Sequence, residues 1–74
     1  MTQNEWQDAT GNDREFFDGY CDGRDLDCPE PSENRSACYR HSFQVGRAEL
    51  AGQPIRADIS RQRAVIAQQK DAGL

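Results

Sequence analysis

The sequence predicts a small all-α domain, and three observations carry this prediction. Apolar residues recur at helical spacing in three segments, proline and glycine residues separate these segments, and no segment alternates apolar and polar residues over enough positions for a strand. With 74 residues the chain holds one domain at most. We expect helices at about 13–25, 34–51 and 57–70 within a domain of residues 12–72, preceded by a flexible segment of residues 1–11.

The first expected helix starts at a polar cap. Asn12 followed by Glu15 resembles a capping box, in which two side chains satisfy free N–H groups of the first turn. Gly19 and Gly23 are four residues apart and therefore lie on one side of this helix. They indicate the close approach of another backbone or, for Gly23, the fraying of the helix end. The apolar face of the helix consists of Phe16, Phe17 and Tyr20.

A loop with Pro29 and Pro31 separates the first helix from the second, because neither proline can continue a helix. Ser32 or Asn34 can then serve as the N-cap of the second helix. The second helix carries one continuous stripe of Tyr39, Phe43, Gly46 and Leu50.

Gly46 lies inside this stripe and can face Gly19, so the first two helices are expected to pack closely as a hairpin. Gly52 followed by Pro54 is the usual order of residues at the end of a helix. The expected seam of the hairpin consists of Gly19, Tyr20, Tyr39, Phe43 and Gly46.

Isoleucines at helical spacing mark the third helix, which is expected to cover the remaining apolar surface of the hairpin. Val65 widens their stripe. Asp58 near the positive end of the helix and Lys70 near its negative end favour the same assignment. The isoleucines of the stripe are Ile55, Ile59 and Ile66.

The net charge of −4 and the isoelectric point of about 4.7 conceal two halves of opposite sign. Residues 1–34 contain ten acidic and two basic residues, a net charge of −8, whereas residues 35–74 contain seven basic and three acidic residues, a net charge of +4. Either the two halves neutralise each other within the fold, or the basic half meets an acidic partner such as RNA.

A series of short motifs runs through residues 16–50, which is under half of the chain. The motifs are Gly19-Tyr20, Gly23-Arg24, Cys28-Pro29, Arg35, Tyr39, Phe43 and Gly46-Arg47-Ala48-Glu49. In order and spacing they resemble the ribosome modulation factor family, small bacterial proteins with two helices joined by a proline-bearing linker. The chain departs from the ribosome-binding members in two respects. Those are strongly basic, whereas this chain has an isoelectric point of about 4.7. They are also short and basic before the first helix, whereas this region is acidic here.

The resemblance implies a non-enzymatic regulator that binds the ribosome or its RNA. Members of the family bind the ribosome in stationary phase, as part of a stress response. Within the family-like segment the expected RNA contacts are Arg35, Arg40 and Arg47. Basic residues also form rows along the second and third helices. Such rows can bind phosphates or simply face solvent. These rows are Arg40 and Arg47 on the second helix, and Arg56, Arg63 and Lys70 on the third.

No cofactor is expected, although one alternative is open. Three cysteines and a histidine are a legitimate zinc ligand set, but the paired spacing typical of zinc motifs is missing, and Cys38 is equally well a small core residue. A catalytic pair of Cys38 and His41 needs a pocket that short helices seldom form, so no enzyme is expected. The alternative metal ligands are Cys21, Cys28, Cys38 and His41.

A cytoplasmic location is the expectation. No apolar run approaches 18 residues, and residues 1–8 lack the basic and apolar regions of a signal peptide. The cysteines are then expected to be thiols. Two other functions remain open: a zinc-stabilised mini-domain, and a protein interaction module or homodimer that uses Ile55, Ile59 and Ile66.

Overall fold

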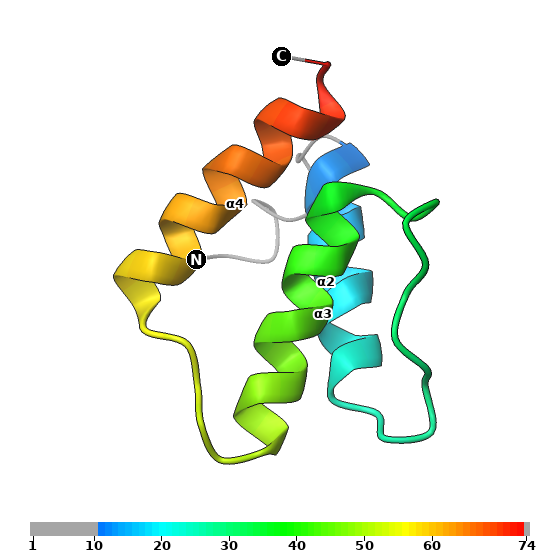
Figure 1. Ribbon diagram of the computed structural model, residues 1–74, viewed down its shortest axis with the longest axis vertical. Helices are drawn as coiled ribbons and strands as arrows, with labels where there is room; N and C mark the ends of the chain where they lie inside the picture. Colours follow the sequence, from blue (N-terminus) through cyan, green and yellow to red (C-terminus); the bar gives the residue numbers. More distant parts are fainter. Residues whose placement is uncertain (1–10, 74) are drawn as a thin grey trace.

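The computed structural model describes the main chain of residues 11–73 and the side chains of residues 14–73. Within these residues it contains three helices and no strand, so the all-α prediction is confirmed: α2 (Gly11–Gly23), α3 (Ala37–Leu50) and α4 (Ala57–Asp71). Residues 1–10 of the predicted flexible segment lie outside the described residues, and Gly11 belongs to α2. Figure 1 shows α2 behind α3 and packed along it, with α4 to the left of α3.

α2 and α3 form the predicted hairpin, and three glycines hold their backbones close together. A Cβ atom on Gly19 would overlap the carbonyl oxygen of Tyr39, and one on Gly23 would overlap that of Phe43. In the opposite direction, a Cβ atom on Gly46 would overlap the carbonyl oxygen of Tyr20. Gly23 is therefore a packing position rather than a frayed end, and the contact needs glycine on both helices.

The core is small and lies mostly on α3. Cys38 and Phe43 are fully buried, and Tyr39 is 3% exposed, so this helix is the centre of the fold. Phe43 and Tyr39 lie with their ring centroids 6.3 Å apart. Both α2 and α4 pack mainly against α3, so each of them depends on α3 for its burial.

Both boundaries of α2 differ from the prediction. α2 begins at Gly11 rather than Asp13, so Asn12 lies within the helix and its assignment as N-cap is wrong. α2 also ends at Gly23 rather than Asp25, because the N–H of Asp25 turns back to the carbonyl of Asp22 at 3.1 Å.

The N-cap of α3 is Ser36, not Ser32 or Asn34. Ser32 does make the hydrogen bond of a capping residue, since its Oγ accepts from the N–H of Asn34 at 3.3 Å. That bond closes a turn within the loop, together with the N–H of Arg35, which donates to the carbonyl of Ser32 at 3.2 Å. The turn delays the helix by three residues, from the predicted start at Asn34 to Ala37.

α4 spans almost the predicted residues, but it packs through its small side chains. Ala67 is its buried residue on the face toward α3. Ile55 and Ile59 are half-buried, whereas Val65 and Ile66 are each 52% exposed. The isoleucine stripe thus borders the contact with α3 instead of filling it. None of the described helices is long and apolar enough to cross a membrane.

Candidate functional site

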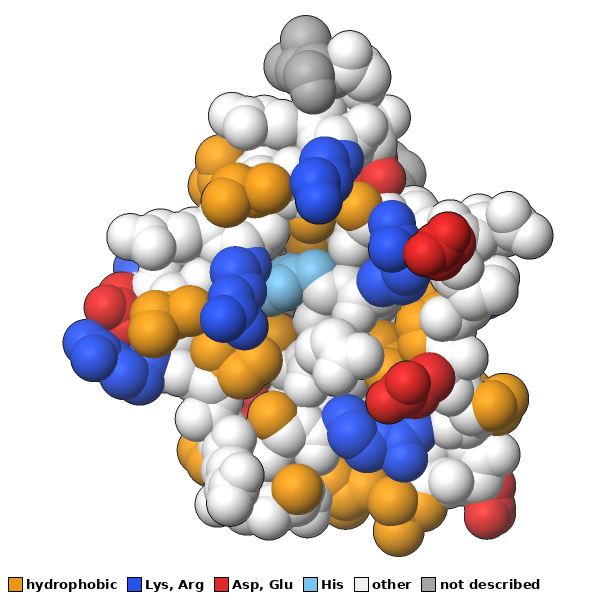
Figure 2. Space-filling model, viewed as in Figure 1, with side chains coloured by type: hydrophobic (Ala, Val, Ile, Leu, Met, Phe, Trp, Pro, Cys, Tyr) orange, Lys and Arg blue, Asp and Glu red, His pale blue; other side chains and the backbone are white. Residues whose placement is uncertain are grey.

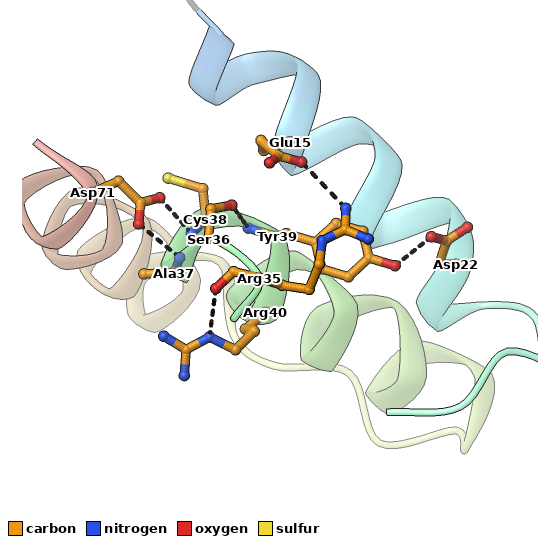
Figure 3. A network of polar contacts seen from close by, with 9 residues as sticks. All are labelled: Glu15, Asp22, Arg35, Ser36, Ala37, Cys38, Tyr39, Arg40 and Asp71. Atoms are coloured by element: carbon orange, nitrogen blue, oxygen red, sulfur yellow. Dashed lines mark hydrogen bonds and ion pairs between the residues drawn. The ribbon is translucent and has the colours of Figure 1, made fainter. Parts of the chain in front are cut away.

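The first turn of α3 is capped from two sides (Figure 3). The Oγ atom of Ser36 accepts from the N–H of Tyr39 at 3.1 Å. The carboxylate of Asp71, at the end of α4, accepts from the N–H groups of Ala37 at 2.7 Å and Cys38 at 2.9 Å. Three of the four free N–H groups of the helix are thereby satisfied. Asp71 ties the end of α4 to the start of α3.

The charge of Asp71 suits this position. Burial alone would raise the pKa of its carboxyl group, but the hydrogen bonds from Cys38 and Ala37 and the nearby Arg40 outweigh burial and hold the pKa below its ordinary value. A carboxylate at the positive end of a helix is also favoured by the helix dipole. The contact therefore fixes the angle between α3 and α4 in the ionised state.

Arg35, a predicted RNA contact, is engaged within the hairpin. Its guanidinium carbon lies 3.6 Å from the centroid of the Tyr39 ring, and it pairs with Glu15 of α2 at 3.5 Å (Figure 3). The Tyr39 hydroxyl donates to Asp22 of α2. Burial and this hydrogen bond raise the pKa of Tyr39 to about 12. Arg35 thus covers the buried tyrosine, and one face of its guanidinium is already used.

Arg47, a second predicted RNA contact, holds the loop between α2 and α3. One terminal nitrogen donates to the carbonyl of Cys28 at 2.7 Å and to that of Asp25 at 3.3 Å. The guanidinium carbon lies 4.9 Å from the centroid of the Phe43 ring. The Arg47 side chain is half-buried and anchors the loop, so its charge is already used within the protein.

A third contact across the hairpin joins Tyr20 and Glu49. The hydroxyl of Tyr20 donates to Oε1 of Glu49 at 2.5 Å, and Arg24 donates to the same oxygen at 3.0 Å. The hydrogen bond to Glu49 is the main cause that raises the pKa of Tyr20. The motifs that carry the family resemblance therefore account for the hairpin: its glycine seam, its loop anchor and its cross-helix hydrogen bonds.

A cleft of about 490 Å³ lies between α3, α4 and the proline-bearing loop. Its volume falls in the range of about 300–1,000 Å³ that is usual for sites of small organic ligands. Apolar side chains and a set of charged side chains share the lining. The charged side chains and the histidine of the lining are Arg40, Arg63, Lys70, Glu30, Glu33 and His41.

Three cations converge on this cleft from two helices. Arg40 comes from α3, and Arg63 and Lys70 come from α4. The Nε atom of Arg40 donates to the carbonyl of Arg35 at 3.3 Å, which directs its guanidinium. Within the described part of the chain, none of the three forms an ion pair within 4.0 Å. Figure 2 shows the cleft face, where the pale blue histidine has Lys or Arg side chains around it.

His41 lies at the centre of this face (Figure 2) and is the only histidine of the chain. Its ring meets the ring of Phe16 edge-on, with the centroids 6.1 Å apart. Burial lowers the pKa of His41, and the positive charge of Arg63 lowers it further, while a hydrogen bond with the main chain of Ser60 acts in the opposite direction. His41 is therefore a neutral ring between cations at neutral pH.

The alternative metal ligands do not come together. Cys21 is exposed on α2, Cys28 is half-buried in the loop, and Cys38 is buried at the start of α3. Among the residues that the structure describes, no three His, Cys, Asp or Glu side chains form a group that could hold a metal ion. The hydrogen bond between the Cys38 side chain and Asp71 gives this thiol a place in the helix contact instead.

The sequence predicts that Arg56, Arg63 and Lys70 form a row along the third helix, but it does not connect this row with Arg40. In the structure Arg63 and Lys70 line the cleft, whereas Arg56 pairs with Asp58 at 3.1 Å. Glu30 and Glu33 gave no signal, because only the folded loop brings them to the cleft. The angle between α3 and α4 is what creates the site, and no periodicity encodes it.

Comparisons with known proteins found no matching family model, no similar curated protein and no similar solved structure.

Proposed function

We propose that this protein is a non-enzymatic regulator that binds RNA on the ribosome, and that it does so with the cleft between α3 and α4. One observation carries the proposal: Arg40, Arg63 and Lys70 meet at one cleft, and none of the three forms an ion pair within 4.0 Å among the described side chains. Lys and Arg side chains that neutralise phosphates supply most of the affinity of non-specific RNA binding. The resemblance to the ribosome modulation factor family supports the ribosome as the partner.

The acidic charge of the chain favours a directed approach. With a net charge of −4, long-range attraction to RNA is weak, and the acidic residues of α2 and of the loop repel phosphates. The cleft gathers three cations between α3 and α4, so we expect the protein to approach RNA with this side. A cytoplasmic location, expected from the sequence, is consistent with such a partner.

Co-sedimentation with purified ribosomes at low and moderate salt tests the proposal. The parent should pellet with ribosomes at low salt. A variant with Arg40→Gln, Arg63→Gln and Lys70→Gln should lose most of this binding, and its salt dependence should be shallower by roughly 0.7 unit of slope per lost phosphate contact with single-stranded RNA.

A matched control separates the cleft from overall charge. Arg14, Arg56 and Arg61 lie outside the lining of the cleft, so changing all three to Gln alters the net charge equally. The control should still pellet with ribosomes. A parent that stays in the supernatant at low salt would exclude the proposed function.

A second candidate is a protein interaction module, because α4 leaves Val65 and Ile66 each 52% exposed and Ile59 only half-buried. Exposed aliphatic side chains on one helix are typical of a surface that a partner or a second copy can cover. Light scattering on the parent and on Val65→Asp tests this alternative. A dimer that the substitution converts to a monomer would favour it.

A further inference from the structure

The cleft carries negative as well as positive charge. Glu30 and Glu33 project from the loop into the lining that Arg40, Arg63 and Lys70 share. Although both signs line one space, no ion pair within 4.0 Å joins these two carboxylates to any described cation. A ligand that brings an anionic group and a set of hydrogen-bond donors would satisfy both kinds of side chain at once.

A nucleotide of RNA is such a ligand, and the carboxylates select among the bases. An ionised carboxylate only accepts hydrogen bonds, and it accepts two in parallel from adjacent donors. Guanine presents two adjacent donors, N1–H and the N2 amino group, on its Watson–Crick edge. Adenine and cytosine place one amino group beside a ring nitrogen acceptor, and uracil places one N–H between two carbonyl oxygens. Carboxylates therefore favour guanine.

The remainder of the lining suits the flat part of a nucleotide. Ile55, Ile66 and Ala67 supply apolar surface, and His41 supplies an aromatic ring that is neutral at neutral pH. Bases of single-stranded RNA stack on aromatic side chains, including histidine, while their edges are read by hydrogen bonds. A guanine within a duplex has its Watson–Crick edge occupied, so only an unpaired guanine can meet the carboxylates.

We propose that the cleft between α3 and α4 binds an unpaired guanosine of single-stranded RNA, with its phosphate at Arg40, Arg63 and Lys70 and its Watson–Crick edge at Glu30 or Glu33. This rests on the proposed RNA-binding function and adds a base preference to it. The acidic loop then acts as the specificity element, which explains why carboxylates line a cleft for an anion.

Fluorescence anisotropy with labelled hexaribonucleotides tests the base preference. The probes are an oligouridine and the same strand with one central guanosine, inosine, adenosine or cytidine. Inosine lacks only the N2 amino group. The guanosine strand should bind the full-length protein about tenfold or more tightly than the other four, the usual scale for a bidentate contact to a base. Equal affinity for the guanosine and inosine strands would overturn the inference.

Two variants locate the preference. Glu30→Gln with Glu33→Gln should bind the guanosine and inosine strands alike, while its affinity for oligouridine stays constant or rises. Asp18 and Asp27 lie outside the lining, so Asp18→Asn with Asp27→Asn changes the charge equally and should keep the preference. A guanosine preference that survives in the double Glu variant would place base recognition elsewhere and overturn the inference.

The failure of this inference is distinct from the failure of the proposed function. Ribosomes that pellet the parent but not the triple cleft variant, together with oligonucleotides bound without base preference, would retain the function and exclude the guanosine site. Absence of ribosome binding by the parent would exclude both. Circular dichroism of each variant checks that helix content is unchanged.

Discussion

The α carbon of Gly46 in α3 lies so close to the main-chain carbonyl of Tyr20 in α2 that no side chain fits between them. The same relationship occurs in reverse at Gly19 and Gly23, which meet carbonyl groups of α3. At these three positions the backbones of the two helices are in direct contact, whereas side chains usually separate two packed helices. The close packing of the hairpin therefore requires the absence of three Cβ atoms.

We expect Gly46→Leu to destabilise the protein, because the new side chain must push α2 away from α3. Overpacking of this kind lowers the free energy of unfolding by about 1–3 kcal/mol. Urea denaturation followed by circular dichroism measures it. Gln62→Leu adds the same side chain at an exposed position of α4 and should have little effect. An unchanged urea midpoint for Gly46→Leu would show that the seam tolerates separation of the helices.

The sequence predicted the hairpin well because its determinants are local and one-dimensional. Helical spacing alone assigns Gly19 and Gly46 to the seam, but the expectation that they face each other is wrong: Gly19 meets the carbonyl of Tyr39, and Gly46 meets that of Tyr20. Gly52, which has a φ of +78°, lies where the end of α3 is expected. The start of α3 was wrong because two serines, Ser32 and Ser36, have equal capping chemistry, and only the folded loop decides between them.

The site was less predictable, because the sequence does not tell which arginines the fold itself uses. Arg35 and Arg47 lie at plausible RNA-contact positions, yet each is held by groups distant in sequence: Glu15 for one and the carbonyls of Asp25 and Cys28 for the other. Arg63 lines the cleft only because α4 packs against α3, and Asp71 contributes two hydrogen bonds to this contact. These relationships depend on tertiary angles that no residue spacing records.

We expect Arg47→Met to destabilise the protein by about 1.5–3 kcal/mol, since two loop carbonyls lose a charged donor. Thermal denaturation measures the loss. Arg56→Met is the control, because the Arg56 side chain is 76% exposed and, among the described residues, pairs only with Asp58 two residues away. If both variants melt together, Arg47 does not anchor the loop, and its charge becomes available to a partner.

We expect Asp71→Asn to weaken the contact between α4 and α3. Capping interactions of this kind contribute about 0.5–2 kcal/mol. The pKa of Asp71 is lower in the folded state than in the unfolded chain, so its contribution is fully present above the unfolded value and is lost as the pH falls through the folded value. The variant should therefore be less stable at pH 7 and lose less stability on acidification.

Denaturation curves between pH 7 and pH 2 measure this difference. Asp18→Asn is the matched control, since the Asp18 side chain is exposed and has no hydrogen bond or ion pair within the described residues. It should keep the pH profile of the parent. If Asp71→Asn also keeps that profile, the capping hydrogen bonds do not depend on the negative charge.

We expect Arg63→Gln to raise the pKa of His41 toward its ordinary value of 6.5. Burial is the main cause that lowers the pKa and stays in place, whereas the repulsion from Arg63 is removed. Because the folded pKa lies below the unfolded one, the protein loses stability as the pH falls from the unfolded value toward the folded value. The variant should lose less stability over that interval.

A proton NMR titration reads this pKa directly, since the chain has a single histidine and therefore one imidazole Hε1 signal. Arg61→Gln removes an equal charge from an exposed arginine that, within the part of the chain the structure describes, donates only to Ala57 of its own helix, so it should leave the titration unchanged. Phosphate groups bound at Arg63 would screen the same repulsion, so RNA should also raise the pKa in the parent and have a smaller effect in Arg63→Gln. Equal titrations of the parent with and without bound RNA would place the RNA away from His41, and hence away from the cleft.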